Sequence, residues 1–377
     1  MKEKIVNNEF LFGLIGLYLF CYVFQVFFYL RFMLKTATYS APELPHTSIP
    51  VSIIICAHNE SDNLKRYLPA VLDQDYPNFQ VVVVNDCSSD DSEMVLAQLK
   101  TKHSNLYYTT IPTDKKFIHG KKLAITLGIK AAQHEHLLFT DADCQPSSDK
   151  WLQIISNQFN EEKEIVIGHG RYHSEKSLVN IFTRFETFWN AVQYFGFALR
   201  KQPFMAVGRN MAYKKELFER SEIFRRHLML ASGDDDLLIN ACATKTNTAI
   251  VLHPDGQTAS AAPGSFRDWF YRKSRHLTTS PHYSARIKFW LITEPITRQL
   301  FWLLTLCSLF FPTFAAYSLA IFASRMILQY IILAKAARRM GEGRLYLYAI
   351  LLDVITPMLL GTVWIVNIFS PNKTKWK

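Results

Sequence analysis

Acidic residues stand at two places in this chain where they could do chemistry together. Asp141 and Asp143 are separated by one residue and follow the apolar run 137–140, and residues 234–236 are three aspartates in a row. Two carboxylates at the first spacing can present oxygens to Mg²⁺ or Mn²⁺. Adjacent acids raise one another's pKa, so one of the three could accept a proton from a hydroxyl group. The sequence thus indicates a divalent-metal site and a general base.

Each acidic group also has a plainer explanation. Asp141 and Asp143 could close a turn through side-chain to backbone hydrogen bonds. The run 234–236 could be the acidic N-terminus of a helix predicted at 236–243, stabilised by the helix dipole, and this explanation can hold for two of the three. A buried strand does not need two acids at its end, so we favour the metal site.

Short apolar runs alternate with helical patterns in the first half of the chain. We expect strands at 51–56, 81–84, 106–110 and 137–140. Apolar residues recur at helical spacing between them, as at Leu64, Leu68 and Leu72. Strands this apolar are covered on both faces, which predicts an α/β fold with a mostly parallel sheet and crossover helices.

An open parallel sheet binds ligands beyond the carboxyl ends of its strands. The polar residues that follow these strands are therefore expected to converge; they are His58, Asn59, Glu60, Asp86, Asp141 and Asp143. Acids there would repel a nucleotide phosphate unless a cation lay between them, so a divalent metal is implied. Other phosphate motifs do not fit, because the Walker A pattern is absent and no glycine follows the first strand.

The two ends of the chain have the composition of membrane segments. Residues 10–30 carry no charge and are long enough to cross a bilayer as one helix, and we favour a retained anchor over a cleaved signal peptide. Near the other end, Arg325 and Asp353 are the charges that interrupt the runs 299–334 and 345–372. The run 299–334 is too long for one ordinary crossing, which predicts a hairpin turning near 312–318.

Basic residues flank these segments on one side, as the positive-inside rule expects for a cytosolic middle domain. The predicted organisation is an N-terminal anchor at 8–34, a cytosolic domain at 49–290 and a C-terminal membrane region at 296–371, with three helices favoured over two. The chain would then be a multi-pass integral membrane protein, in the plasma or inner membrane if its source is a bacterium. Its net charge of +10 is explained by acidic lipid and a phosphate donor, and we expect no nucleic-acid partner.

Six segments resemble, in order and approximate spacing, the motif series of family 2 glycosyltransferases. They are VSIIICAHNE at 51–60, VNDCSSD at 84–90, GKKLA at 120–124, TDAD at 140–143, GDDDL at 233–237 and RKSRH at 272–276. The flanking apolar segments are similar to the membrane-embedded branch that includes poly-N-acetylglucosamine, hyaluronan and ceramide-glucosyl synthases. This resemblance spans about residues 49–290 and implies a GT-A fold.

The resemblance also implies roles for the site residues. The donor nucleotide sugar would be bound by Ala57, Asn59, Glu60, Asp86, Lys121, Asp141 and Arg275. Lys122 could take the place of Lys121. Asp143, with Asp141 beside it, would hold the metal. Asp234 would be the catalytic base, with Asp235 as its rival because the family's preceding glutamate is absent here.

One element departs from the family pattern and bears on the product. The family's Q-x-x-R-W element stands here as residues 272–276, with Arg272 for Gln and His276 for Trp. Loss of the tryptophan platform favours a single addition over processive synthesis. We therefore expect an inverting transferase that moves a sugar, from UDP by preference, to a hydroxyl of a lipid or saccharide acceptor at the cytosolic membrane face.

Two other functions compete with this expectation. A metal-dependent nucleotidyltransferase would use similar acids on a similar sheet but release pyrophosphate. A membrane scaffold with a degenerate transferase-like domain would explain the altered element at 272–276. The aromatic stripe at 178–199 has helical spacing and is core by default, with a lipid acceptor path as the alternative.

Overall fold

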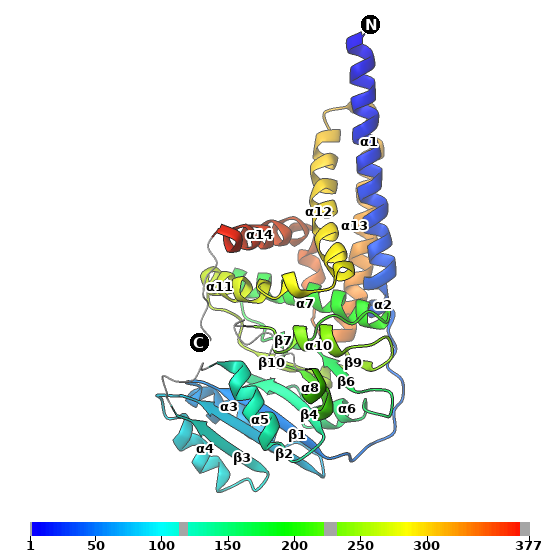
Figure 1. Cartoon of the computed structure of the whole chain (residues 1–377). Coiled ribbons are helices and arrows are strands. Elements are labelled where there is room, and N and C mark those ends of the chain that lie inside the picture. The colour runs from blue at the N-terminus through cyan, green and yellow to red at the C-terminus, as the bar shows by residue number, and fades with distance from the viewer. Residues whose placement is uncertain (1, 113–119, 222–231, 370–377) are drawn as a thin grey trace.

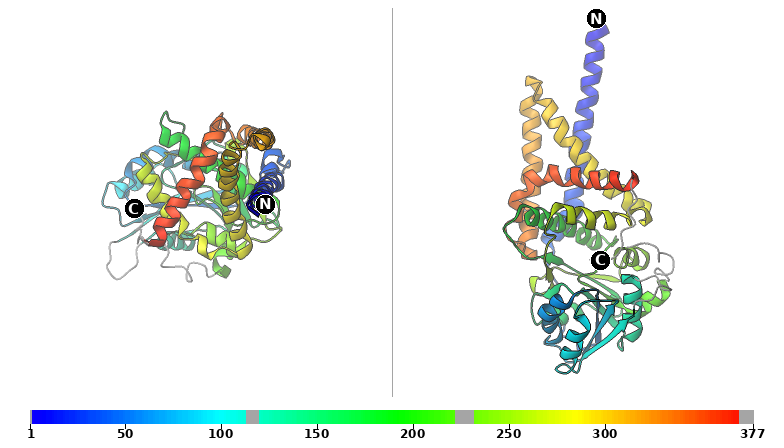
Figure 2. Two further views of the ribbon diagram at one scale, coloured as in Figure 1. Left: turned by 90° about the horizontal axis from the view of Figure 1, so that it is seen from above. Right: turned by 90° about the vertical axis from the view of Figure 1, so that its left-hand side faces the viewer.

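The computed structural model describes residues 2–112, 120–221 and 232–369, with side chains from residue 12 onward. An α/β domain forms one end of the molecule, and a stalk of long helices forms the other (Figure 1). Between them lies a layer of helices, α7, α11 and α14, that run across the direction of the stalk (Figures 1 and 2).

The central sheet has seven strands in the order β3-β2-β1-β4-β8-β6-β9. The first four are parallel, and β8 is antiparallel to both of its neighbours. The strands are β1 (Val51–Ala57), β2 (Phe79–Asp86), β3 (Leu106–Ile111), β4 (His136–Asp141), β6 (Ile165–Gly168), β8 (Met211–Lys214) and β9 (Thr248–Val251). The predicted mostly parallel α/β fold is confirmed, with all four predicted strands in place.

The apolar side chains of a strand lie alternately in two hydrophobic cores, one on each side of the sheet, because successive side chains point to opposite faces. Ile53 and Ile55 of β1 pack with α3 (Ser61–Leu72) and α4 (Ser92–Lys100), whereas Ile54 packs with α5 (Lys121–Ala131). Both faces of the sheet are therefore buried, as a parallel sheet with crossover helices requires. The remaining short helices of the domain are α6 (Trp151–Ser156), α8 (Lys215–Ser221) and α10 (Asp236–Cys242).

A second, three-stranded sheet adjoins the end of β4. It consists of β5 (Cys144–Pro146), β10 (Thr258–Ser260) and β7 (Gly170–Tyr172), in that order. β5 begins directly after Asp143, so the turn that carries Asp141 and Asp143 is held between two sheets. This double attachment positions the acidic turn.

The crossing layer is built on α7 (Leu178–Leu199) and α11 (Phe266–Leu277). The aromatic stripe of α7 is buried, with Phe185, Phe188 and Phe195 at 0% exposure, so core packing accounts for it. Each helix begins with a serine whose hydroxyl accepts a backbone hydrogen bond: Ser177 from Asn180 and Ser265 from Asp268, both at 3.1 Å.

The stalk is made of α1, α12 and α13. α1 (Lys2–Phe28) continues through a π-helical turn, η1 (Tyr29–Met33), into α2 (Leu34–Thr38), and it packs against α12 (Ala285–Ser308) and α13 (Pro312–Met340). The hairpin between α12 and α13 turns at 309–311, earlier than the predicted 312–318. Pro312 explains the shift, because its fixed φ and missing N–H suit the first turn of α13.

Among the described residues, three helical segments are long and apolar enough to cross a membrane, namely Phe12–Thr38, Pro312–Met340 and Leu345–Phe369. The last of these comprises η4 (Leu345–Tyr348) and α14 (Ala349–Phe369). α14 lies across the stalk rather than along it (Figure 2). Its outer side is apolar, and Ile350, Leu351 and Met358 are 58% to 62% exposed.

Inside the stalk, the two charges that interrupt the apolar runs pair with each other. Arg325 and Asp353 are both fully buried, and Arg325 Nη1 lies 2.5 Å from Asp353 Oδ2. Arg325 Nη2 also donates to the hydroxyl of Tyr29 at 2.6 Å and to Gln25 Oε1 at 3.1 Å. This network joins α1, α13 and α14.

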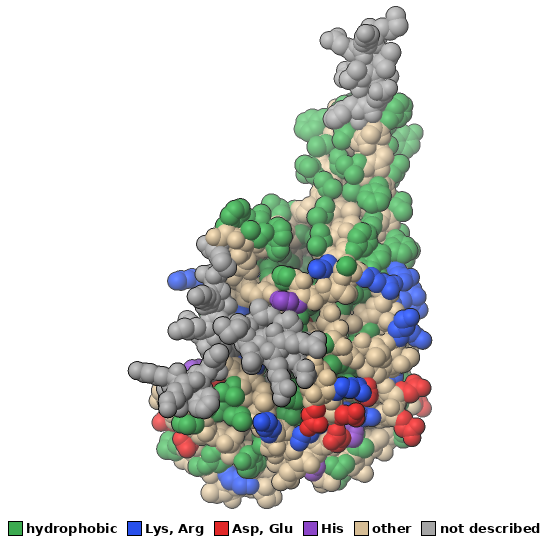
Figure 3. Space-filling view, in the orientation of Figure 1, with side chains coloured by type: hydrophobic (Ala, Val, Ile, Leu, Met, Phe, Trp, Pro, Cys, Tyr) green, Lys and Arg blue, Asp and Glu red, His purple; other side chains and the backbone are tan. Residues whose placement is uncertain are grey.

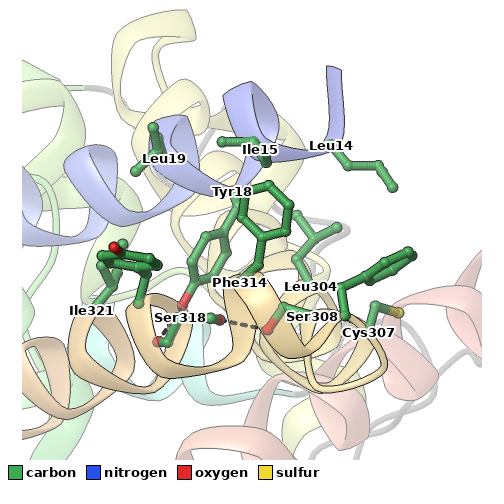
Figure 4. Close-up of a pocket in the computed structure, with 12 residues that line it drawn as sticks. Leu14, Ile15, Tyr18, Leu19, Leu304, Cys307, Ser308, Phe314, Ser318 and Ile321 are labelled. Carbon is green, nitrogen blue, oxygen red and sulfur yellow. Dashed lines mark hydrogen bonds between the residues drawn. The ribbon is translucent and has the colours of Figure 1, made fainter. Parts of the chain in front are cut away.

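Nearer the hairpin, the three stalk helices enclose a small apolar pocket of about 110 Å³ (Figure 4). The Tyr18 hydroxyl donates to the carbonyl of Ser318 at 3.0 Å, and Ser308 Oγ donates to Ser318 Oγ at 2.6 Å. These hydroxyl groups satisfy one another inside the helix bundle, so they stabilise the packing of α1 against the hairpin.

Candidate active site

The acidic turn after β4 brings possible metal ligands together. One carboxylate oxygen each of Asp141 and Asp143, and the Cys144 sulfur, all lie within 4.8 Å of one another. Burial and the neighbouring Asp141 charge raise the pKa of Asp143. A divalent cation would relieve this repulsion, and hard carboxylate oxygens are the ligands that Mg²⁺ and Mn²⁺ prefer. The residues present therefore fit such an ion.

Lys121 connects this turn to the aspartate run. Its Nζ atom lies 2.8 Å from Asp141 Oδ1 and 3.3 Å from Asp234 Oδ2. Burial raises the pKa of Asp141, but the charge and hydrogen bond of Lys121, together with the charges of Arg209 and Arg275, lower that pKa on balance. Lys121 is the first residue of α5, so the start of one crossover helix joins two acidic segments that are far apart in the chain.

The neighbouring Lys122 is in a different position. Its side chain is largely buried, and burial lowers the pKa of its ammonium group. Of the two lysines that the sequence left open, Lys121 is thus the one in direct contact with Asp141 and Asp234.

The three adjacent aspartates have three different environments. Asp236 Oδ2 accepts hydrogen bonds from the hydroxyl groups of Thr279 and Tyr283, both at 2.5 Å. Asp235 accepts backbone N–H bonds from Gly208 and Asp236, both at 2.8 Å, and caps α10. Asp234 forms the ion pair with Lys121. The helix-start explanation therefore applies to Asp235 and Asp236, while Asp234 lies beside the metal-binding turn.

Asp235 has a strongly shifted titration. Burial, followed by the charges of Asp234 and Asp236, raises its pKa to about 7. The same aspartate run therefore contains one carboxyl group that titrates near neutral pH and one that is ion-paired to a lysine.

The loops after β1 and β2 are tied to each other. His58 Nδ1 lies 2.5 Å from the carbonyl oxygen of Asp86, and Asn59 Oδ1 accepts a hydrogen bond from the backbone N–H of Ser89 at 2.8 Å. Asn59 and Cys87 both have left-handed backbone conformations, with φ of 56° and 54°. Such strained residues often lie at ligand sites.

The other residues predicted to bind the donor lie at the same edge of the sheet. Asp86 ends β2 and is 1% exposed, and Glu60 accepts a hydrogen bond from Asn63 Nδ2 at 2.5 Å. Ala57 ends β1 with its methyl group buried in the core, so its backbone is the part that a donor could meet.

Cations of α11 influence the acidic turn electrostatically. After larger contributions from burial and nearer groups, the charge of Arg275 contributes to the lowered pKa of Asp141, and that of Arg272 opposes, without reversing, the raised pKa of Asp143. Burial, followed by the charges of Lys273 and Arg275, lowers the pKa of His276 well below its usual range. His276 is therefore a neutral hydrogen-bonding group at pH 7.

Sequence reasoning missed two site residues, Gly208 and Arg209. Arg209 donates to Ser260 Oγ and to the Gly170 carbonyl, both at 2.9 Å, and its guanidinium lies 4.2 Å from the centre of the Tyr172 ring. Its charge also lowers the pKa values of Asp141 and Asp143. In the sequence, Gly208 and Arg209 are a glycine followed by a basic residue shortly before β8. No periodic pattern of residues singles out this pair.

At Gly208 the chain passes close to the charged groups. A Cβ atom built there would lie 3.4 Å from Asp235 Oδ2 and 3.6 Å from Lys121 Nζ. The backbone N–H of Gly208 also holds Asp235 in place. The edge of the sheet thus combines an acidic pair that could hold a metal ion, a carboxylate ion-paired to lysine, and cations that could meet a diphosphate.

Comparison with known proteins agrees with this arrangement. Residues 52–221 match the model of glycosyl transferase family 2. Over 130 residues the chain is 27% identical to the poly-beta-1,6-N-acetyl-D-glucosamine synthase of Staphylococcus epidermidis, which covers 34% of this chain and 30% of the relative. It is 28% identical over 132 residues to the Escherichia coli UDP-Glc:alpha-D-GlcNAc-diphosphoundecaprenol beta-1,3-glucosyltransferase WfaP, covering 34% of this chain and 48% of that one. The chain thus spans less than half the length of these curated relatives.

Among solved structures, the chain is similar to the mannosyltransferase PcManGT of Pyrobaculum calidifontis in complex with GDP-Man and Mn²⁺. The TM-score is 0.56 at 18% identity, over 95% of this chain and 99% of that one. This similarity concerns the fold. The run 234–236 and Arg275 lie beyond the residues matched by the family model, so their roles are proposals. Residues 52–221 thus match glycosyl transferase family 2, and the structure has a GT-A-like α/β fold.

Proposed function

We propose that this protein is a membrane-bound, inverting glycosyltransferase that moves a sugar from a nucleotide-diphosphate donor to an acceptor hydroxyl. The observation that carries the proposal is the position of Lys121 between Asp141 and Asp234. It joins the metal-binding turn to a carboxylate that can act as a base. A transferase needs both functions within the span of one sugar.

The donor would lie along the carboxyl ends of β1, β2 and β4. Asn59, Glu60 and Asp86 would meet its base and ribose, since carboxylates and amides accept hydrogen bonds from imide and hydroxyl groups. UDP is the preferred nucleotide, and the glucosyltransferase relative from Escherichia coli has UDP-Glc in its name.

Asp143 and Asp141 would hold Mg²⁺ or Mn²⁺, which when bound supplies positive charge to the leaving diphosphate. Arg275 and Arg209 add fixed positive charge on the same side, and both already act on Asp141. Charge neutralisation at the leaving group is the largest contribution expected from such a site.

Asp234 is our candidate for the base. It would take the proton of the acceptor hydroxyl as that oxygen attacks the anomeric carbon and the bond to the diphosphate breaks. A single displacement of this kind inverts the anomeric centre. Asp235 is the alternative, but both of its carboxylate oxygens already accept backbone N–H bonds.

The acceptor would be a lipid or a saccharide, and we favour a single addition. His276 and Arg272 stand where processive relatives of the family have tryptophan and glutamine. A neutral imidazole offers a smaller stacking surface than an indole ring, which weakens the grip on a growing chain.

The apolar helices indicate membrane association, and we propose a multi-pass arrangement with the catalytic domain in the cytosol. Hydrophobic side chains cover the stalk, and lysine and arginine side chains gather where the stalk meets the rest of the molecule (Figure 3). This is the positive-inside pattern. In this arrangement α1 with α2 crosses the membrane, as do α12 and α13 as a hairpin. α14, although long and apolar enough to cross, rests on the membrane surface with Ile350 and Leu351 toward the lipid, so we propose two C-terminal crossings in place of the three expected from the sequence.

The test is an assay of membranes containing the full chain with a panel of labelled nucleotide sugars and Mn²⁺. We expect label from one donor to reach an organic-soluble or saccharide product with release of nucleoside diphosphate. Asp234→Asn should reduce transfer by roughly 10²–10⁴-fold. Release of pyrophosphate instead would favour the nucleotidyltransferase, and the absence of transfer from every donor would favour the scaffold.

A further inference from the structure

A second cavity lies away from the aspartates, between the start of α7 and the segment that links α13 to η4. Its volume is about 620 Å³. It is lined on one side by residues 174–178 with Ile181 and Arg184, and on the other by residues 342–345 with Leu347 and Tyr348. None of the residues assigned to the candidate active site is among them. We call it the headgroup cavity.

The headgroup cavity lies at the level where two candidate membrane segments end. Arg339, in the last turn of α13, donates from Nε to the carbonyl of Ala37 at 2.8 Å, and Ala37 is in α2 at the end of the segment Phe12–Thr38. Gly341 and Gly343 follow with left-handed φ values of 67° and 62°, which let the chain turn sharply into η4. The cavity wall is formed at this turn.

The inner wall is polar and ordered. Arg184 donates to Ser174 Oγ at 2.7 Å and lies 3.4 Å from Glu342 Oε2. The second oxygen of Glu342 lies 2.7 Å from His169 Nε2. Glu342 is 2% exposed and has both oxygens engaged, so its negative charge is balanced within the wall. The Nε atom of Arg184 is buried with no hydrogen-bond partner among the described residues.

The outer part of the headgroup cavity combines positive charge with apolar surface. Lys176 and Arg344 are exposed at its edge, together with one acidic side chain, Glu175. Beside them, Leu178 is 79% exposed, Leu347 54% and Tyr348 42%. A free anion would gain no binding energy from the apolar side chains at this edge, whereas a phospholipid presents a phosphate next to hydrocarbon.

We propose that the headgroup cavity binds the phosphate headgroup of an anionic membrane phospholipid. Lys176, Arg184 and Arg344 would meet the phosphate, while Leu178, Leu347 and Tyr348 contact the acyl region. Such a lipid would join the catalytic domain, through α7, to the end of the membrane-spanning α13. This inference does not depend on the sugar-transfer chemistry.

The proposal is tested by measuring lipid binding to the purified full chain in detergent with native mass spectrometry. The probes are phosphatidylglycerol, phosphatidylcholine and inorganic phosphate. We expect phosphatidylglycerol to bind in preference to phosphatidylcholine, and millimolar inorganic phosphate to compete poorly. The double variant Lys176→Gln/Arg344→Gln should bind phosphatidylglycerol about 30-fold more weakly, because two charge contacts are lost.

Arg338→Gln is the matched control, because Arg338 is exposed at the same end of α13 but does not line the cavity. It should bind the lipid like the unaltered protein. Leu178→Asn/Leu347→Asn should weaken lipid binding without changing the binding of inorganic phosphate. Equal phosphatidylglycerol binding by the charge variant and the control would overturn the proposal. So would equal binding of phosphatidylcholine, and full displacement by inorganic phosphate would assign the cavity to a free anion.

Discussion

The Lys121 ammonium nitrogen lies 2.8 Å from Asp141 Oδ1, which fixes the start of α5 against the end of β4. The same nitrogen is 3.3 Å from Asp234 Oδ2. One cation thus holds two carboxylates at a short separation. Lys121 also engages the Asp141 oxygen that could otherwise coordinate a metal ion.

Replacement of Lys121 should therefore have two opposite effects. Lys121→Met should lower sugar transfer by about 10²–10³-fold, because a fixed charge beside the reacting groups is lost. It should at the same time tighten Mn²⁺ binding, because Asp141 loses its competing cation. Isothermal titration of Mn²⁺ and a transfer assay measure the two effects. Lys130→Met, on an exposed position of the same helix, is the control. Weaker Mn²⁺ binding by Lys121→Met would contradict this account.

Removal of the proposed metal ligand should abolish metal binding selectively. Asp143→Asn should weaken Mn²⁺ binding by at least about 100-fold, since even loss of an outer partner costs 10–100-fold at such sites. Asp149→Asn is the matched control, because Asp149 is an exposed aspartate shortly after the turn. Unchanged Mn²⁺ affinity in Asp143→Asn, measured by titration calorimetry, would remove Asp143 from the site.

The raised pKa of Asp235 predicts a pH-dependent stability. The pKa is about 7 in the folded protein and about 3.9 in an unfolded chain, so between these values the folded state binds more protons. Stability contributed by this group is therefore present below about pH 4 and is lost as the pH rises through 7.

Asp235→Asn lacks this titration. Relative to the unaltered protein, its melting temperature should rise between pH 5 and about pH 7 and level off above that, whatever its absolute value. Thermal unfolding in a series of buffers measures the difference. A constant difference across that range would mean that Asp235 titrates at an ordinary pKa.

Asp90 should stabilise the loops that follow β1 and β2. Its carboxylate accepts the backbone N–H of Ser61 at 2.9 Å and that of Ser92 at 3.0 Å, at the starts of α3 and α4. Asp90→Ala should cost about 1 kcal/mol, as for loss of a helix cap. Asp91→Ala is the control, because the Asp91 side chain makes no capping hydrogen bond.

The effect of Asp90 should also disappear in acid. Desolvation raises the pKa of Asp90, but the hydrogen bonds from Ser92 and Ser61 together lower this pKa to about 2. Its stabilisation is thus present above about pH 4 and is lost as the pH falls toward 2. The melting curves of Asp90→Ala and the unaltered protein should converge over that range. A gap that persists at pH 2 would show that the charge is not responsible.

Removing one partner of the buried Arg325–Asp353 ion pair should destabilise the protein more than removing both. Arg325→Met leaves the buried Asp353 with Arg298, at 3.5 Å, as its remaining cation among the described residues, at an expected cost of up to about 3–5 kcal/mol. The double variant Arg325→Met/Asp353→Leu should recover much of that loss, because the poorly compensated charge is gone. Unfolding in detergent measures both, with the exposed Arg338→Met as control. Equal stability of the single and double variants would argue against the pairing.

Much of the catalytic domain could be predicted because its strands are continuous apolar runs. β1, β2, β3 and β4 lie where those runs are, since a parallel sheet buried on both faces demands apolar residues at every position. The turn at Asp141 and Asp143 followed from the same argument. Arg209 could not be found in this way, because its importance comes from contacts with β7 and β10, which are distant in the chain.

The amino-acid sequence by itself determined the α/β order, the acidic pair after a buried strand and the segments with membrane character. These depend on local composition and periodicity, which can be read along the chain. The tertiary structure alone decided that Lys121, rather than Lys122, meets Asp234, that Asp235 and Asp236 hold the start of α10, and that α14 crosses the stalk. Each of these depends on how elements far apart in the chain pack together, because packing sets which side chains come within hydrogen-bonding distance.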